Sequence, residues 1–197
     1  MKSVFAQLVQ AMQRAHRQLG IGRIDQHANL DLGCGDRQNI DAFFGKCLEH
    51  LRRHAAGQGL AIDYVNATVE ELQKQGRQFD AVVCLEVVEH VPDVGAFLKS
   101  CAALVRPGGL MLLSTLNRTM KAYLLAIIGA EYVLRWLPVG THQWERFVTP
   151  DELGRHLKAA GLGVPVLQGL IYSPFSDIWA LSGDTDVNYF AAAAKPG

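Results

Sequence analysis

The feature that most constrains the fold is a regular alternation of short apolar runs with amphipathic, helix-length stretches from residue 28 onward. The apolar runs are typical of buried strands, and the stretches between them repeat apolar residues at helical spacing. We expect strands at 28–32, 60–65, 79–87 and 110–116, with helices at about 40–56, 67–76 and 94–105. This order predicts an α/β fold with a mostly parallel sheet and helices on both faces.

The chain has 197 residues and 49% hydrophobic content, which is enough for one well-buried core. We therefore expect a single domain over residues 1–197. Two more strand-like stretches, 164–174 and 187–195, are joined by a polar segment that contains glycine, and they are expected to pair as an antiparallel hairpin. Residues 119–142 interrupt the pattern as an apolar insertion.

Composition excludes several classes of protein. Nineteen lysines and arginines balance nineteen aspartates and glutamates, so nothing indicates nucleic-acid binding. The four cysteines form no C-x-x-C pair, which favours a reducing compartment and buried free thiols. The first 20 residues are amphipathic and lack the apolar core of a secretory signal. These features predict a cytoplasmic protein that acts on small molecules.

The stretch LDLGCG places a glycine turn at the end of an apolar strand. After Asp31, the turn at Gly33 and Gly35 would expose backbone N–H groups at the carboxyl edge of the sheet, where open α/β sheets bind ligands. A tight turn that merely needs two glycines is about as common. The loop lacks the third glycine of a dinucleotide site and the G-K-[ST] ending of a phosphate loop. A nucleotide-dependent oxidoreductase is accordingly disfavoured.

Successive motifs of the chain resemble those of class I S-adenosylmethionine-dependent methyltransferases, which have a Rossmann-like fold. They are LDLGCG, FDAVVCLEVVEHVPD, LVRPGG and STLNR. From Leu60 onward the sequence is similar, more narrowly, to the ubiquinone-biosynthesis O-methyltransferases, with STLNR and GAEYVLRWLPVGTH as the most specific stretches. The resemblance implies S-adenosylmethionine as cofactor and a polyprenylated phenol or catechol as substrate. The cofactor residues that it implies are Asp31, Gly33, Gly35, Asp41 and Leu85.

The position of the acid that should bind the cofactor ribose is unusual. Such an acid is expected about 20 residues beyond the glycine loop, whereas Asp41 follows Gly35 by only six. Three explanations are open: a helix–strand unit is missing from this sequence, the chain is a genuinely shortened relative, or Asp63, at the end of LAIDY, replaces Asp41. The intact motifs downstream favour the first.

A cluster of polar residues follows the strand at 79–87. If the chain turns helical there, Glu86, Glu89 and His90 lie on one face and could bind Mg²⁺, Mn²⁺ or Zn²⁺. The resemblance favours this metal site, since relatives have been assigned a metal at the E-x-x-E-H pattern. A structural role at the end of a strand is the alternative. The same three residues are the predicted catalytic groups, and His90 alone could act as general base.

Residues 121–137 are the most hydrophobic stretch, but a helix of this length spans about 25 Å, short of the bilayer core. Taken alone it would be read as a buried helix. The resembling family uses this segment to contact membrane lipid, which implies peripheral association with the inner membrane. His142, just beyond it, could line the substrate pocket or lie in a surface loop.

We therefore predict an O-methyltransferase of ubiquinone biosynthesis that acts on 2-polyprenyl-6-hydroxyphenol and 3-demethylubiquinol. Other proteins of that pathway are the implied partners. Two alternatives are a non-catalytic, membrane-associated relative and a methyltransferase for a soluble phenol. The first predicts membrane binding without cofactor binding, and the second predicts cofactor binding without membrane binding.

Overall fold

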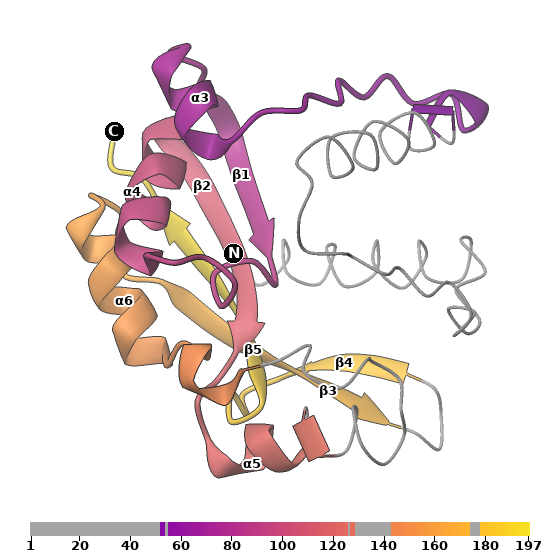
Figure 1. Ribbon diagram of the computed structural model, residues 1–197, viewed down its shortest axis with the longest axis vertical. Helices are drawn as coiled ribbons and strands as arrows, with labels where there is room; N and C mark the ends of the chain where they lie inside the picture. Colours follow the sequence, from indigo (N-terminus) through magenta and orange to yellow (C-terminus); the bar gives the residue numbers. More distant parts are fainter. Residues whose placement is uncertain (1–51, 54, 126, 129–142, 174–177) are drawn as a thin grey trace, which may run out of the picture.

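The computed structural model describes residues 52–53, 55–125, 127–128, 143–173 and 178–197. Their five strands form one sheet in the order β1-β2-β5-β3-β4 (Figure 1). The strands are β1 (Phe79–Leu85), β2 (Val105–Leu116), β3 (Val166–Ser173), β4 (Ile178–Ser182) and β5 (Asn188–Ala194). β1 and β2 pair in parallel, and the other three pairings are antiparallel.

Three helices pack along one face of this sheet, on the left in Figure 1. They are α3 (Val69–Lys74), α4 (Val94–Leu104) and α6 (Pro150–Ala159). Local sequence explains where they begin. Thr68 and Thr149 form capping boxes with Glu71 and Glu152, so the first backbone N–H groups are satisfied by side chains. The helices expected at 67–76 and 94–105 correspond to α3 and α4, whereas α6 was not predicted.

The core follows the alternation of side chains along β2. Met111 and Leu113 are fully buried with Leu98 of α4 and Leu153 of α6, in the layer between sheet and helices. Leu112, between them in sequence, joins a smaller cluster with Phe190 and Ala192 of β5. Because successive residues of a strand point to opposite faces, one strand supports both layers. β2 is therefore buried on both sides, as its continuous apolar run indicates.

A glycine turn in the stretch RPGG, residues 106–109, interrupts the first residues of β2. Gly108 has φ +75°, a conformation that a residue with a side chain adopts only with strain. A side chain at Gly109 would approach the carbonyl oxygen of Asp80 to 2.8 Å. The register between β1 and β2 shifts here, so that Phe79 faces Val105 but Ala81 faces Leu110.

Some expectations were wrong in detail. Residues 60–65 form no strand: Leu60 and Ile62 are at least half exposed, and this segment joins no described ladder. Without neighbouring backbone to pair with, an apolar alternation does not make a strand. The sequence predicted a mostly parallel sheet. Since 60–65 is absent from the described sheet, only one of its pairings is parallel. The strand expected at 28–32 lies outside the described residues.

The C-terminal hairpin was predicted incompletely. β3 and β5 are antiparallel neighbours, as expected. The segment between them, however, contributes β4, which pairs with the other edge of β3. β4 has only five residues and exposes Ile178 and Trp179 at the edge of the sheet. Its sequence therefore lacks the alternation of apolar and polar residues that would have predicted a strand.

The apolar insertion begins with α5 (Met120–Ala122) and continues in π-helical turns over 123–125 and 127–128. Ala122 and Ile127 are buried against Leu116 and Phe147. Leu124, like Leu125, is 55% exposed. A short 3₁₀ helix, η2 (Trp144–Arg146), leads into α6. None of the described helices is long and apolar enough to cross a membrane.

Truncation of Leu98 tests the assignment of the core. Leu98→Ala should lower the free energy of unfolding by about 2–5 kcal/mol, because it removes fully buried methyl groups and leaves a cavity. Urea denaturation followed by circular dichroism measures the change. Leu124→Ala, at an exposed leucine, is the matched control and should change the free energy by less than about 0.5 kcal/mol. Equal effects of the two substitutions would contradict this core.

Candidate functional site

The candidate site lies where the parallel strands β1 and β2 end side by side. Leu85, the last residue of β1, is in register with Ser114 of β2. The carboxyl ends of adjacent parallel strands form the edge at which open α/β sheets bind their ligands. Two carboxyl groups, those of Glu86 and Glu89, follow β1 at this edge and are held by hydroxyl groups of β2.

Glu86 is fixed to Ser114 by three hydrogen bonds. Its backbone N–H donates to the Ser114 carbonyl oxygen at 3.0 Å and to Ser114 Oγ at 3.2 Å. Ser114 Oγ in turn donates to Glu86 Oε1 at 2.6 Å. Although the residue as a whole is exposed, its carboxyl group is turned back onto the buried Ser114.

Glu86 also has the left-handed backbone angle φ 53°, the only positive φ among the described residues other than glycine. Such a conformation costs free energy for a residue with a side chain, and it persists only where the surroundings enforce it. Strain of this kind concentrates at functional sites. Here it aims the Glu86 side chain at the strand ends.

Glu89 is more deeply placed, with only 3% of the residue exposed. Thr115 Oγ1 donates to its Oε2 at 2.8 Å. Its other oxygen, Oε1, is buried and has no hydrogen-bond partner among the described residues. An unpartnered carboxylate oxygen is costly to bury, so it marks a place where a proton or a ligand group would be bound.

The surroundings of Glu86 change the pKa of its carboxyl group. Burial raises the pKa of Glu86 to about 7, the hydrogen bond from Ser114 opposes the rise, and the nearby Glu89 adds to it. A carboxyl group with a pKa near neutrality can accept a proton at neutral pH. The pair is therefore suited to general base catalysis.

The three-residue metal site expected from the sequence is not formed. After Leu85 the chain makes a turn, closed by the His90 N–H donating to the Val87 carbonyl at 2.9 Å, rather than a helix. The positive φ of Glu86 breaks helical geometry at once. His90 is exposed while Glu89 is buried, and no cluster of three metal-ligating side chains exists within the described part of the chain. The donor set thus fits a metal ion poorly.

Of the predicted cofactor residues, only Leu85 lies within the described part of the chain. Asp31, Gly33, Gly35 and Asp41 lie outside the described residues, as does His142. Leu85 is half-buried at the end of β1 and packs against the cluster of Leu112 and Phe190, so it stands at the edge where a cofactor would bind.

Asp63, the alternative ribose acid, is misplaced for that role. It ends no strand, its side chain is 77% exposed, and it lies 3.7 Å from the Arg77 guanidinium. A ribose acid should follow a strand of the sheet, so this alternative is wrong in the described structure. Asp41 remains the predicted residue.

The polar residues of the motif STLNR were not predicted to take part in the site. In the structure Ser114 and Thr115 hold the two carboxyl groups. Asn117 Nδ2 donates to the Thr185 carbonyl at 2.9 Å. Arg118 donates to the Phe147 carbonyl at 3.2 Å and pairs with Glu152 of α6. Four polar residues within five positions, at the end of a buried apolar run, were the available signal.

Comparisons with known proteins identify the family of the chain. The profile of a methyltransferase domain family matches residues 6–164. A ubiquinone biosynthesis O-methyltransferase of Nitrobacter winogradskyi is 56% identical over 180 residues, covering 85% of this chain and 69% of the relative. One of Bradyrhizobium diazoefficiens is 58% identical over 140 residues, covering 71% of this chain and 55% of the relative.

Solved structures show the same fold. An S-adenosylmethionine-dependent methyltransferase of Thermotoga maritima, described as a possible histamine N-methyltransferase, superposes with a TM-score of 0.50 at 12% identity, covering 75% of this chain and 70% of that one. The sheet and helices are therefore those of the Rossmann-like class I methyltransferases. The chain belongs to the family of ubiquinone biosynthesis O-methyltransferases and is an S-adenosylmethionine-dependent enzyme.

Proposed function

We propose that this chain methylates a phenolic hydroxyl of a polyprenylated ubiquinone precursor, with 2-polyprenyl-6-hydroxyphenol and 3-demethylubiquinol as the acceptors. The observation that carries the chemistry is the Glu86 carboxyl group, held by Ser114 at the carboxyl edge of the sheet with a pKa raised to about 7. The identity with ubiquinone biosynthesis O-methyltransferases supports the substrate class.

The reaction requires two things of the protein. It must hold the acceptor oxygen in line with the methyl group, and it must remove the phenolic proton so that the oxygen becomes a nucleophile. When bound, S-adenosylmethionine supplies the methyl carbon as an electrophile. Glu86 accepts the proton of the phenol, while Thr115 keeps the neighbouring Glu89 in place. Glycines 33 and 35 with Asp41 would hold the cofactor, and Leu85 would flank it.

A divalent cation at this site would take Glu86 and Glu89 as ligands, the latter through its unpartnered Oε1. His90, the third predicted ligand, is exposed, and the described residues contain no group of three side chains that could hold a metal ion.

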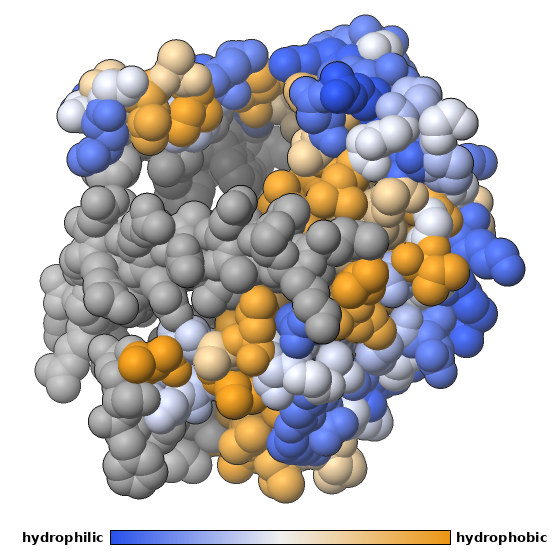
Figure 2. Space-filling model, turned by 180° about the vertical axis from the view of Figure 1, so that it is seen from behind, coloured by the Kyte–Doolittle hydropathy of each residue, from blue (hydrophilic) through white to orange (hydrophobic). Residues whose placement is uncertain are grey.

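The proposed substrate resides in a bilayer, which gives a role to the apolar insertion. Leu124, Leu125 and Ile128 expose their side chains, while the buried residues of the same segment fix it to the core. Figure 2, a view from behind, shows hydrophilic residues along the right-hand edge of the molecule and apolar residues gathered nearer the middle of this face. We propose that residues 121–137 lie in the membrane interface, so that the enzyme is peripheral to the cytoplasmic face of the inner membrane. Other enzymes of ubiquinone biosynthesis are the proposed partners there.

Cofactor binding is the first test of the proposal. S-adenosylhomocysteine should bind the purified chain saturably in a calorimeter, and Asp41→Ala should weaken this binding by at least about tenfold, because it removes charged hydrogen bonds to the ribose. Asp63→Ala removes an equally acidic but exposed side chain and should leave the affinity unchanged. A folded wild-type chain that binds no S-adenosylhomocysteine would instead support a non-catalytic, membrane-associated relative.

The dependence of the rate on pH tests Glu86. Because the ionised carboxylate is the base, kcat should rise as the pH increases through about 7. Glu86→Gln should lower kcat by about 10²- to 10⁴-fold.

Ser114→Ala removes the bond that stabilises the ionised form of Glu86, so the midpoint of the pH–rate profile should move upward by about one unit. Ser100→Ala, at a serine of α4, is the control and should leave the midpoint in place. A midpoint insensitive to Ser114 would exclude Glu86 as the base.

Vesicle binding tests the membrane role. The double substitution Leu124→Ser and Leu125→Ser should raise the Kd for phosphatidylcholine vesicles by at least about tenfold, since two exposed apolar side chains can no longer enter the lipid. Cosedimentation measures the change, and retained binding of S-adenosylhomocysteine shows that the variant is folded. Val164→Ser, at a valine that is 89% exposed elsewhere, is the control. Undiminished vesicle binding of the double variant would contradict the role of these two leucines. A wild-type chain that binds S-adenosylhomocysteine but no vesicles would favour a methyltransferase for a soluble phenol.

A further inference from the structure

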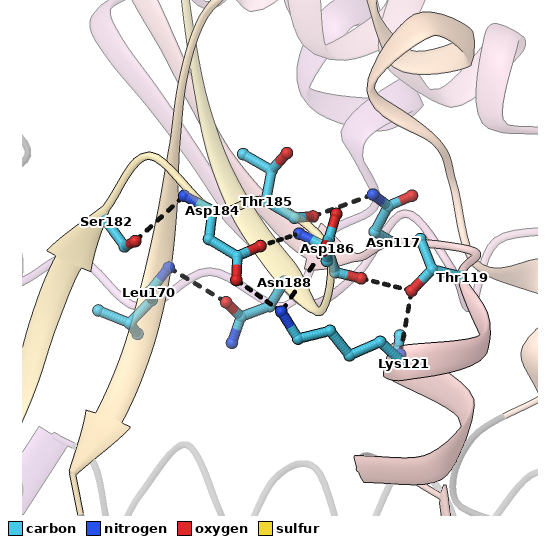
Figure 3. A network of polar contacts seen from close by, with 10 residues as sticks. Asn117, Thr119, Lys121, Leu170, Ser182, Asp184, Thr185, Asp186 and Asn188 are labelled. Carbon is cyan, nitrogen blue, oxygen red and sulfur yellow. Dashed lines mark hydrogen bonds and ion pairs between the residues drawn. The ribbon is translucent and has the colours of Figure 1, made fainter.

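Lys121 stands at the start of the apolar insertion, yet its ammonium group faces the protein. Lys121 Nζ lies 2.6 Å from Asp184 Oδ2 and 3.4 Å from Asp186 Oδ2. Both aspartates belong to the segment between β4 and β5, residues 183–187, here named the β4–β5 turn. Figure 3 shows the lysine reaching from α5 across to this turn. The positive charge of Lys121 is thus matched by two carboxylates.

Neutral hydrogen bonds join the same two segments. Asn117 Nδ2 donates to the Thr185 carbonyl at 2.9 Å, and the Asn117 N–H donates to the Val187 carbonyl at 2.9 Å. Thr119 Oγ1 donates to the Asp186 carbonyl at 2.5 Å and, as the N-cap of α5, accepts from the Ala122 N–H at 3.0 Å. One side chain therefore both begins the helix and bonds the β4–β5 turn.

The β4–β5 turn is itself firmly placed. The Asp184 N–H donates to Ser182 Oγ at 3.0 Å, and the Asp186 N–H donates to Asp184 Oδ1 at 2.9 Å. Gly169 of β3 lies so close to the Asp184 carbonyl that a Cβ atom there would collide with it. The turn is thus a fixed support rather than a free loop, and its two carboxylates are presented by the sheet.

The ion pair between Lys121 and Asp184 persists at neutral pH. The hydrogen bond from Lys121 lowers the pKa of Asp184, and the bond to Asp184 raises the pKa of Lys121. Both groups therefore remain charged at neutral pH. Because they are exposed, each pair alone is weak, and the support comes from the pairs together with the neutral bonds.

We propose that Lys121 is a positioning residue: held by Asp184 and Asp186, it fixes the start of the apolar insertion on the β4–β5 turn and so orients Leu124 and Leu125 toward lipid. The orientation of the two leucines toward lipid rests on the proposed membrane role. The attachment of Lys121 to the β4–β5 turn does not, because it exists in water without a membrane. The opposing idea is that Lys121 binds anionic lipid headgroups directly.

Hydrogen exchange tests the attachment without any membrane. In the variant Asp184→Asn with Asp186→Asn, amides of residues 117–125 should exchange about three- to tenfold faster than in the wild type, because the ion pairs that hold the segment are lost. Lys121→Met should have the same effect, and Lys121→Arg, which keeps the charge, should restore protection. Lys158→Met, at an exposed lysine of α6, is the control. Unchanged exchange in both the double variant and Lys121→Met would overturn the proposal.

Vesicle binding separates the two ideas. If Lys121 is a positioning residue, the Asp184→Asn, Asp186→Asn variant should bind phosphatidylcholine vesicles and phosphatidylglycerol-containing vesicles more weakly by a similar factor, about threefold or more. If Lys121 is a headgroup ligand, freeing it from the aspartates should strengthen binding to the anionic vesicles and leave the zwitterionic ones unaffected. That second result would overturn the proposal. A wild-type chain that binds neither vesicle would refute the membrane role, and the exchange measurement would still decide the attachment.

Discussion

The carboxyl end of β2 holds the site together, because four polar side chains there bond three other segments of the chain. Ser114 and Thr115 hold the carboxyl groups that follow β1. Asn117 bonds the β4–β5 turn, and Arg118 bonds the start of α6. β2 is buried on both faces and cannot move without unpacking the core. Each of these bonds therefore fixes its partner segment relative to a rigid strand.

The same arrangement explains how a strained and costly pair of acids is maintained. Glu86 has a left-handed backbone, and Glu89 buries an oxygen that lacks a described partner. Neither is favourable alone. The hydroxyl donors of β2 offset part of the cost by bonding one oxygen of each carboxyl group. In this view stability is lowered locally in order to place a base of raised pKa at the edge of the sheet.

The two proposed working surfaces of the molecule also meet at this strand end. Only a few residues separate Ser114, which contacts the acid, from Lys121, which contacts the β4–β5 turn. Leu116 lies between them and packs against Ala122 and Ile127 of the apolar insertion. A substrate with a polar head and a greasy tail would need both surfaces at a fixed separation, and a short rigid connection supplies that separation.

Much of the fold could be predicted because local patterns determine it. The helices α3 and α4, the strand β1 and the glycine turn before Leu110 follow from residue types close in sequence. No helix was predicted at α6, although its capping box at Thr149 is a local signal. β4 and the absent strand at 60–65 could not be predicted in this way. Whether an apolar alternation becomes a strand depends on a neighbouring backbone, and that neighbour is distant in sequence.

The sequence by itself determined the family, the alternating elements and the acids that follow β1. Only the tertiary structure decided how those acids are used. The positive φ of Glu86 turns the chain away from a helix, so Glu86 and Glu89 approach the hydroxyls of β2 while His90 is left exposed. The tertiary structure likewise brings Lys121 to two aspartates that are more than sixty residues away in sequence. Spacing along the chain fixes which side chains a local element offers, whereas partners that are remote in sequence are chosen by packing.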